Sequence, residues 1–295
     1  MLSSPSINEV FGQGAQDFAA LASRMNVEFS AGSVRYKFFA AEEFERLMID
    51  DAPQAQRIYW HELVGRAHFA AASSILRSAQ WLTGVQVARE QNLYLPFCAN
   101  LRSLIESAAD SFDGVAGVAQ TLAENRGAVN DALNMKSSQV ITSRELEDQL
   151  IHFSHGRKLT KGEVAPQSHS AKSARAYVEQ LEKLGLSQAH AIYGLLCQVT
   201  HPASDSLSHF LSETGDSEFT LFPHNDRVAI AALAEKHKAF LHTLLRYAFN
   251  QPIILLRVLL HIGLPDYHSA EISRLDLSAM PGWQKCARLM GTPAA

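Results

Sequence analysis

Three side chains suited to acid–base or nucleophilic chemistry recur at steps of four residues in the second half of the chain. They are Tyr193, Cys197 and His201, and residues four apart share one face of a helix. Pro202 forces His201 out of the helical conformation, and an imidazole at a helix C-terminus gains stability when it is protonated. His201 is therefore the first candidate for acid–base catalysis. The alternative is that His201 only caps the helix while Tyr193 and Cys197 pack in the core.

A second set of candidates is a row of charges at helical spacing. Arg102, Glu106 and Asp110 lie four residues apart, on the flank of an apolar stripe where a helical bundle can partly bury them. If this flank faces a cleft, the Arg102 guanidinium can bind an anion. The alternative is a solvated flank or a structural ion pair. The candidate catalytic residues are therefore His201, Arg102, Glu106 and Tyr193.

A basic segment stands out in a chain that is acidic overall. Between residues 156 and 175 there are five lysines and arginines and one acidic residue, Glu163. Such local positive charge can contact the phosphates of a nucleic acid. The alternative is a flexible solvated connection, because no aromatic residue is interleaved to stack on bases. The candidate nucleic-acid-binding residues are Arg157, Lys158, Lys161, Lys172 and Arg175.

The sequence offers little for a metal ion or a cofactor. His61 and His68 share a helical face, but two imidazoles seven residues apart need a third helix to supply further ligands for one ion. The chain has no phosphate-binding glycine loop, no H-E-x-x-H motif and no G-x-S-x-G nucleophile elbow. We therefore expect no metal site and no cofactor.

Helices must position these candidate residues. Apolar residues recur at steps of three and four over residues 54–82 and again over 94–113, which predicts two long amphipathic helices. Gly84 punctuates the pattern, and a short connection between long helices favours an antiparallel hairpin. We therefore predict an all-α fold, an antiparallel helical bundle built on these two helices. At most a short strand or hairpin is expected near residues 218–223.

Shorter helices are expected on either side of this pair. The segment 156–173 combines Gly, Pro, Ser, Lys and His without periodicity, which predicts a loop or linker. It separates an N-terminal helical region, 1–155, from a C-terminal helical region, 174–264. We expect the two regions to pack as one composite domain, with 265–295 as a tail. The shorter helices are predicted at 7–25, 34–49, 118–133, 143–156, 174–184, 187–200, 226–248 and 252–264. Ser143 is the predicted N-cap of the helix at 143–156.

The composition excludes several classes of protein. A chain of 295 residues that is 47% hydrophobic and 19% charged is not disordered, collagen-like or a coiled coil. Its 26 basic and 30 acidic residues give a net charge of -4, so the whole chain does not attract nucleic acid or anionic lipid. Three separated cysteines and an N-terminus without an apolar run predict a cytoplasmic protein. The most apolar window, 252–264, is too short for a membrane helix.

The two sets of candidate residues occur in an order that resembles a known group of proteins. Over about residues 54–212 the chain resembles bacterial all-α proteins with Arg-x-x-x-Glu and Tyr…His-Pro features, a group that looks related to HEPN-like helical bundles. Many HEPN-like proteins serve in toxin–antitoxin or phage-defence modules, and some are metal-independent ribonucleases. In those nucleases an arginine closely precedes the histidine, whereas the residues just before His201 are uncharged. The resemblance therefore implies that Arg102 is the partner of His201. The residues that carry it are Arg102, Glu106, Tyr193, His201 and Pro202.

Three functional hypotheses follow. The leading one is a cytoplasmic helical protein that binds a protein partner or its own copies through a polar cleft lined by the candidate residues. The alternative is a HEPN-type metal-independent ribonuclease in which His201 acts as acid and base, Arg102 holds phosphate and the basic segment guides RNA. A third hypothesis is a small-molecule pocket lined by aromatic residues of the bundle, which could equally be plain core. Those residues are Trp60, Tyr94, Phe97 and Phe112.

Overall fold

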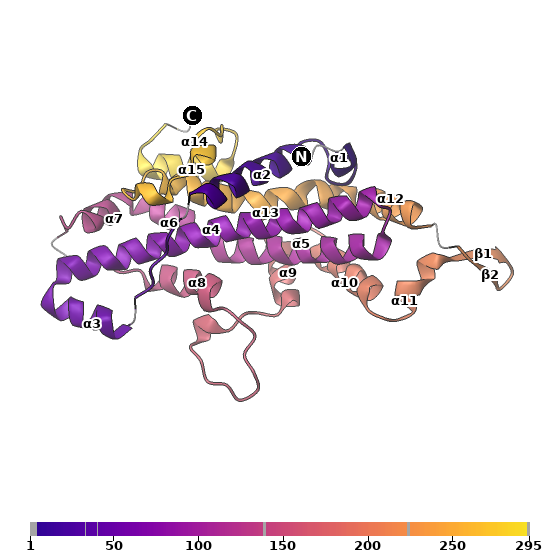
Figure 1. Ribbon diagram of the computed structural model, residues 1–295, viewed down its shortest axis with the longest axis horizontal. Coiled ribbons are helices and arrows are strands. Elements are labelled where there is room, and N and C mark those ends of the chain that lie inside the picture. The colour runs from indigo at the N-terminus through magenta and orange to yellow at the C-terminus, as the bar shows by residue number, and fades with distance from the viewer. Residues whose placement is uncertain (1–4, 33, 40, 138–139, 223–224, 294–295) are drawn as a thin grey trace. The chain divides into compact units, whose positions relative to one another are not determined.

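The fold is all-α with one short antiparallel hairpin, which confirms the predicted fold class (Figure 1). It is known from a computed structural model of the chain. No helix among the described residues is long and apolar enough to cross a lipid bilayer. The described residues are 5–32, 34–39, 41–137, 140–222 and 225–293.

Two long helices form where the apolar periodicity predicts them. They are α4 (Ala52–Glu90) and α5 (Tyr94–Val115), joined by three residues. Helix α4 continues through Gly84, so this glycine does not end it. A Cβ atom at Gly84 would collide with the side chain of Asn100 on α5. The glycine therefore serves the close approach of the two helices.

The chain divides into two compact units, and each unit is made of three separate segments. Helices α4, α5 and α13 (Lys238–Leu259) each contribute residues to both units. One unit boundary, between residues 172 and 173, falls at the end of the predicted linker 156–173. The first unit comprises residues 1–23, 76–110 and 173–249, and the second unit comprises 24–75, 111–172 and 250–295.

The first unit holds the hairpin and the helices that lead to it. Its core includes Phe97 and Leu101 of α5, both fully buried, and a stacked pair of rings, Phe18 and Phe249, 5.3 Å apart. In the hairpin, Leu211 lies opposite Leu221 in an antiparallel register. The further elements of this unit are α1 (Pro5–Phe11), α9 (Ala174–Lys183), α10 (Ala189–Thr200), α11 (Ser204–Leu207), η2 (Ser208–Phe210), β1 (Leu211–Gly215), β2 (Glu218–Leu221) and α12 (Asp226–Lys236). Helix α2 (Ala15–Ala31) begins in this unit and ends in the other.

The second unit holds the remaining helices. The predicted N-cap of α8 (Arg144–His155) is confirmed, because the Ser143 hydroxyl accepts a hydrogen bond from the Leu146 amide at 3.4 Å. The largest fully buried side chains of the second unit include Trp283 and Tyr267. The further elements are α3 (Ala41–Asp50), α6 (Val118–Glu124), α7 (Arg126–Leu133), α8 (Arg144–His155), η1 (Gln167–His169), η3 (Pro265–Tyr267), α14 (Ala270–Ser273) and α15 (Pro281–Met290).

Several of the shorter predicted helices have other boundaries in the structure. The predicted helix 7–25 is divided after Phe11, and the predicted helix 118–133 is divided at Asn125.

Two larger errors concern residues 34–39 and the C-terminal helices. Residues 34–39 have no regular secondary structure and run as a drawn-out segment between α2 and α3 (Figure 1); we call them the extended segment. Their polar groups are held by distant partners: the Tyr36 hydroxyl lies 2.7 Å from His68 Nδ1, and the Phe39 amide donates to Glu62 Oε2 at 3.0 Å. Tertiary contacts here override local helix propensity.

The second error concerns the C-terminal helices. The break between helices lies at His237 rather than near Pro252. Pro252 is inside α13, where a proline removes one backbone hydrogen bond. The buried residues on both sides of it, Phe249 and Ile253, keep the helix packed through this point.

Candidate functional site

Three of the four candidate catalytic residues come together between α5 and α10 in the first unit. The Tyr193 hydroxyl donates to Glu106 Oε1 at 2.8 Å. Arg102 Nε lies 3.4 Å from the same oxygen as an ion pair, and Arg102 Nη1 donates to Thr200 Oγ1 at 3.2 Å. The side chains of Arg102 and Glu106 are about one-third exposed, at 37% and 32%. We call Arg102, Glu106, Tyr193 and Thr200 the polar cluster.

The electrostatics of the polar cluster keep its tyrosine a hydrogen-bond donor. Burial raises the pKa of Tyr193 above its ordinary value, and hydrogen bonds to Glu106 and Cys197 raise it further. A phenol that stays protonated cannot act as a general base at neutral pH. The arrangement thus fits a structural ion pair that fixes α10 on α5.

His201 ends α10 as its sequence predicts. Its backbone is extended, with φ of -77° and ψ of 139°, which is the conformation that a following proline demands. The imidazole is exposed, and in the described part of the chain it makes no hydrogen bond and no ion pair. Its link to the polar cluster is Thr200, the residue directly before it, which Arg102 contacts. Sequence reasoning did not single out Thr200, because a hydroxyl at a helix end carries no distinctive signal.

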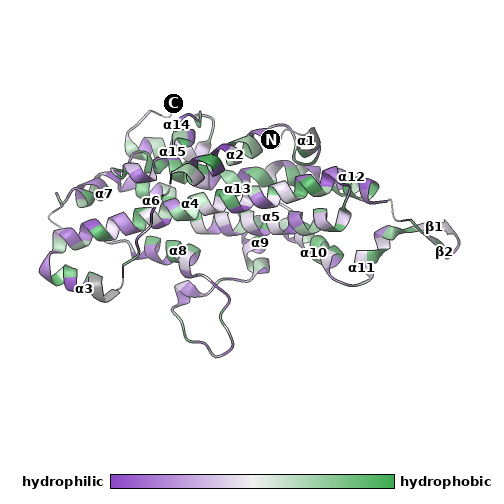
Figure 2. Cartoon of the chain, in the orientation of Figure 1, coloured by the Kyte–Doolittle hydropathy of each residue, from purple (hydrophilic) through white to green (hydrophobic). Residues whose placement is uncertain are grey.

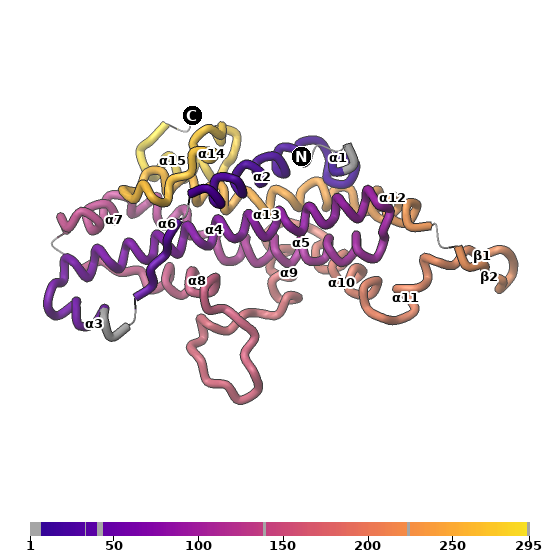
Figure 3. The backbone as a smooth tube through the Cα atoms, viewed as in Figure 1, coloured from indigo at the N-terminus to yellow at the C-terminus, as the bar shows by residue number. Residues whose placement is uncertain are grey.

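The basic segment is largely neutralised by neighbouring carboxylates. Arg157 makes a two-point ion pair with Glu163, Lys172 Nζ lies 2.6 Å from Asp113, and Arg175 Nε lies 2.8 Å from Glu179. Lys158 and Lys161 are exposed on the open loop between α8 and α9 (Figure 3). Two lysines are a much weaker phosphate-binding surface than five separate cations, because each neutralised phosphate adds to affinity.

The two histidines considered for a metal lie against an aromatic ring instead. His61 and His68 both contact the ring of Tyr267, at centroid distances of 5.7 Å and 5.3 Å. His68 is 2% exposed, and its burial lowers the pKa to about 4 despite the nearby Glu28 carboxylate. No group of three potential metal ligands occurs among the described residues.

Exposed apolar side chains gather on the hairpin and its flanks. Phe219 and Leu221 are 60% and 70% exposed. Figure 1 shows the hairpin extending away from the helices of its unit, and Figure 2 shows apolar and polar residues side by side along it. The exposed apolar residues of this region are Leu207, Leu211, Phe219, Leu221, Phe222 and Val228. We call residues 211–221 the hairpin arm.

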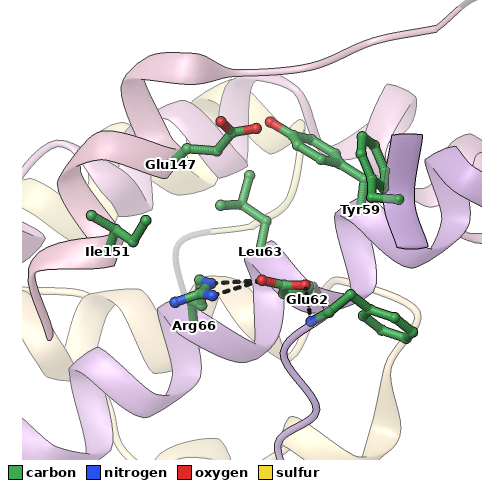
Figure 4. A pocket seen from close by; sticks show the side chains of 8 residues that line it. Tyr59, Glu62, Leu63, Arg66, Glu147 and Ile151 are labelled. Atoms are coloured by element: carbon green, nitrogen blue, oxygen red, sulfur yellow. Dashed lines mark hydrogen bonds and ion pairs between the residues drawn. The ribbon is translucent and has the colours of Figure 1, made fainter. Parts of the chain in front are cut away.

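The second unit contains a cavity of about 310 Å³, which we call the aromatic pocket (Figure 4). Its wall joins residues of the extended segment 34–39 to residues of three helices. Tyr59 and Glu147 stand on one side, and an ion pair of Glu62 with Arg66 lies across from them, with Leu63 between. The lining residues are Phe39, Phe44, Tyr59, Glu62, Leu63, Arg66, Glu147 and Ile151.

The aromatic residues proposed from sequence as a pocket do not line this cavity. Trp60 and Phe97 are 2% and 0% exposed and belong to the core. The Tyr94 ring contacts the ring of His209 in a tilted arrangement, with 4.9 Å between the centroids. The pocket uses Tyr59, the neighbour of Trp60, which lies off the apolar stripe and therefore gave no signal in the periodicity.

The polar cluster, the hairpin arm and the aromatic pocket are thus the candidate sites that the chain itself presents. A comparison with protein-family models, with curated proteins and with solved structures finds no match for this chain.

Proposed function

We propose that this chain is a helical binding and assembly protein that docks its hairpin arm on a basic, partly apolar surface of a protein partner. The observation that carries the proposal is the concentration of exposed large apolar side chains between residues 207 and 228. Monomeric proteins rarely leave such side chains grouped on their surface, and contiguous apolar patches mark interaction sites.

The chemistry of the hairpin arm favours a basic partner. Residues 211–221 carry three carboxylates, Glu213, Asp216 and Glu218, and no lysine, arginine or histidine. A surface of opposite charge speeds association and excludes like-charged partners. A hairpin of only two strands is marginally stable alone in water, so a partner that covers its apolar face would also stabilise its fold.

The polar cluster would support this role by fixing the helix that leads to the hairpin arm. Arg102 and Tyr193 fix α10 on α5 through Glu106, and α10 leads through α11 into the hairpin.

The three cysteines, Cys98, Cys197 and Cys286, are free thiols. Since free thiols persist in reducing compartments, we infer that the protein works in the cytoplasm.

The test combines Phe219→Ser with Leu221→Ser in one variant. Both side chains are exposed, so the free energy of unfolding should change by less than about 1 kcal/mol, while partner binding should weaken at least about tenfold. Sedimentation at low and moderate salt first shows whether the partner is a second copy. If the protein is monomeric, a bound partner is identified by affinity capture and purified, and its affinity for each variant is measured by calorimetry.

Thr220→Ser serves as the matched control, because Thr220 lies in the same strand with its side chain on the opposite face. This variant should assemble like the unmodified protein. Equal binding by the double variant and the control would refute the proposal. So would a partner whose binding surface is acidic or whose affinity rises with salt.

A metal-independent ribonuclease of the HEPN-like type is the second candidate function. It is favoured by the bond from Arg102 to Thr200, which brings a guanidinium to the residue next to the exposed His201. In this reaction the imidazole would move protons while Arg102 stabilises phosphate charge. Such a role would suit a toxin–antitoxin or phage-defence module.

His201→Ala tests this candidate directly. Unstructured RNA is incubated with the purified protein in the presence of a chelator, and fragments are resolved on a gel. Loss of a general acid–base group should slow cleavage by about 100-fold or more. His190→Ala is the control, because His190 belongs to the same helix and pairs with Glu179 instead. Absence of cleavage by the unmodified protein, or equal cleavage by the His201 variant, would rule the nuclease out.

A further inference from the structure

The aromatic pocket of the second unit has a wall that is built from four separate parts of the chain. Phe39 comes from the extended segment 34–39 and Phe44 from α3. Helix α4 contributes Tyr59, Glu62, Leu63 and Arg66, and α8 contributes Glu147 and Ile151. Concave sites lined by apolar groups with a few fixed polar groups are the usual form of small-molecule sites. The volume of about 310 Å³ fits a small ligand.

Each nitrogen of Arg66, the cation among the lining residues, already donates a hydrogen bond within the protein. Arg66 donates through Nε and Nη2 to Glu62 Oε1, at 3.0 Å and 2.7 Å, and through Nη1 to Ser154 Oγ at 2.5 Å. The ring of Phe38 covers its guanidinium at 4.2 Å. An anionic ligand would have to share Arg66 with Glu62, whose negative charge already neutralises the guanidinium in a largely buried ion pair.

Glu62 is satisfied in the same way. Its second oxygen accepts the Phe39 amide at 3.0 Å, so Glu62 and Arg66 together contribute no net charge to the pocket. The charge that remains on the lining residues is the Glu147 carboxylate, which points toward the Tyr59 hydroxyl (Figure 4). The lining side chains therefore carry a net charge of -1, and the nearest cation outside the lining that contacts one of them is Lys37, whose ammonium lies over the ring of Phe39.

Tyr59 is held in place at the edge of the pocket. Its hydroxyl accepts the backbone amide of Ser143 at 2.7 Å, and it lies edge-to-face with Trp60 at 5.3 Å. Burial, followed by a hydrogen bond to Glu147, raises the pKa of Tyr59. The phenol thus presents a fixed ring face beside a carboxylate, without charge of its own.

We propose that the aromatic pocket binds a small organic ammonium ion with an apolar substituent. The rings of Phe44 and Tyr59 and the Glu147 carboxylate attract a cation through the ring quadrupoles and through charge. The third ring, Phe39, already has the Lys37 ammonium 4.1 Å from its centroid. Leu63 and Ile151 supply apolar surface for the substituent. This site is independent of the hairpin arm, because its residues belong to the other unit.

The experiment titrates the full-length protein with three probes that share a phenylethyl group and differ in the charge of the terminal group. They are protonated 2-phenylethylamine, neutral 2-phenylethanol and anionic 3-phenylpropionate, each titrated at neutral pH in a calorimeter. We expect the amine to bind at least about tenfold more tightly than the alcohol, and the acid to bind most weakly. Equal affinity for the amine and the alcohol, or tighter binding of the acid, would overturn the proposal. Absence of amine binding up to millimolar concentration would overturn it too.

Glu147→Gln then locates the site. Glutamine keeps a hydrogen-bond acceptor for Tyr59 while it removes the charge, so amine affinity should fall about tenfold and alcohol affinity should stay the same. Glu145→Gln is the matched control, because Glu145 is exposed on the same helix and does not line the pocket. A fall in amine affinity that is equal in both variants would show only a general surface-charge effect and would reject this site. Should Glu147→Gln unfold the protein, Phe44→Leu takes its place with the same expected loss of amine binding.

Discussion

Arg66→Met should lower the free energy of unfolding by about 2 to 4 kcal/mol, because it leaves a carboxylate without its cation. The Arg66 side chain is 10% exposed and that of Glu62 is 19% exposed. After the substitution, Glu62 keeps the Phe39 amide but loses two charge-assisted bonds from the guanidinium. Methionine fills much of the same space, so the loss is electrostatic rather than a cavity effect. Chemical denaturation at neutral pH measures it.

A double variant separates the ion pair from other effects of the substitution. Arg66→Met combined with Glu62→Gln removes both charges, and it should recover a large part of the lost stability, since the unpaired charge is the main cost. Arg144→Met is the surface control and should stay within about 0.5 kcal/mol of the unmodified protein, because Arg144 is exposed. Additive losses in the double variant would show that the two charges do not interact.

The second large effect is a loss of stability on acidification that originates at His68. Burial lowers the pKa of His68 from 6.5 to about 4 in the folded protein. Between these two values the unfolded chain takes up a proton that the folded chain does not bind. Stability is therefore complete above about pH 7 and falls as the pH drops toward 4, by up to about 3 kcal/mol from this residue.

The measurement is the free energy of unfolding at several pH values for the unmodified protein and for His68→Gln. Glutamine does not titrate and still offers a polar partner to the Tyr36 hydroxyl, which lies 2.7 Å from His68 Nδ1. The free energy of unfolding of His68→Gln should depend clearly less on pH than that of the unmodified protein, whatever the absolute stability of the variant. Burial also lowers the pKa values of His155, His237 and His261, so some slope with the same sign should remain. Identical slopes would contradict the assignment to His68.

The spacing of apolar residues in the sequence predicted the helices that bury one amphipathic face. The helices α4 and α5 came from apolar residues at steps of three and four, and the N-cap at Ser143 came from its residue type. Gly84 was misread because a glycine that admits a neighbouring helix looks the same in sequence as one that ends a helix. The extended segment 34–39 was missed because its partners, Glu62 and His68, lie far away in the chain.

The same contrast between local spacing and contacts with distant parts of the chain decided which candidate site could be predicted from the sequence. Arg102 and Glu106 share a helix face, and Tyr193 was marked by the histidine–proline pair that follows it, so spacing alone suggested that they act together. The orientation of the His201 imidazole depends on the turn after α10, which spacing does not describe. The aromatic pocket could not be predicted, because it brings Phe39 of the extended segment together with Glu147 and Ile151 of α8, which lie more than 100 residues away in the chain.

The three thiols differ in a way that gives the protein a natural attachment point for a spectroscopic reporter. Cys98 and Cys286 are buried, and burial raises the pKa of both, that of Cys98 to about 12. Cys197 is half-buried on α10, four residues before His201. A maleimide dye should therefore label Cys197 first, since alkylation needs an accessible thiolate. Its emission would then follow events at the end of α10 without any engineered residue.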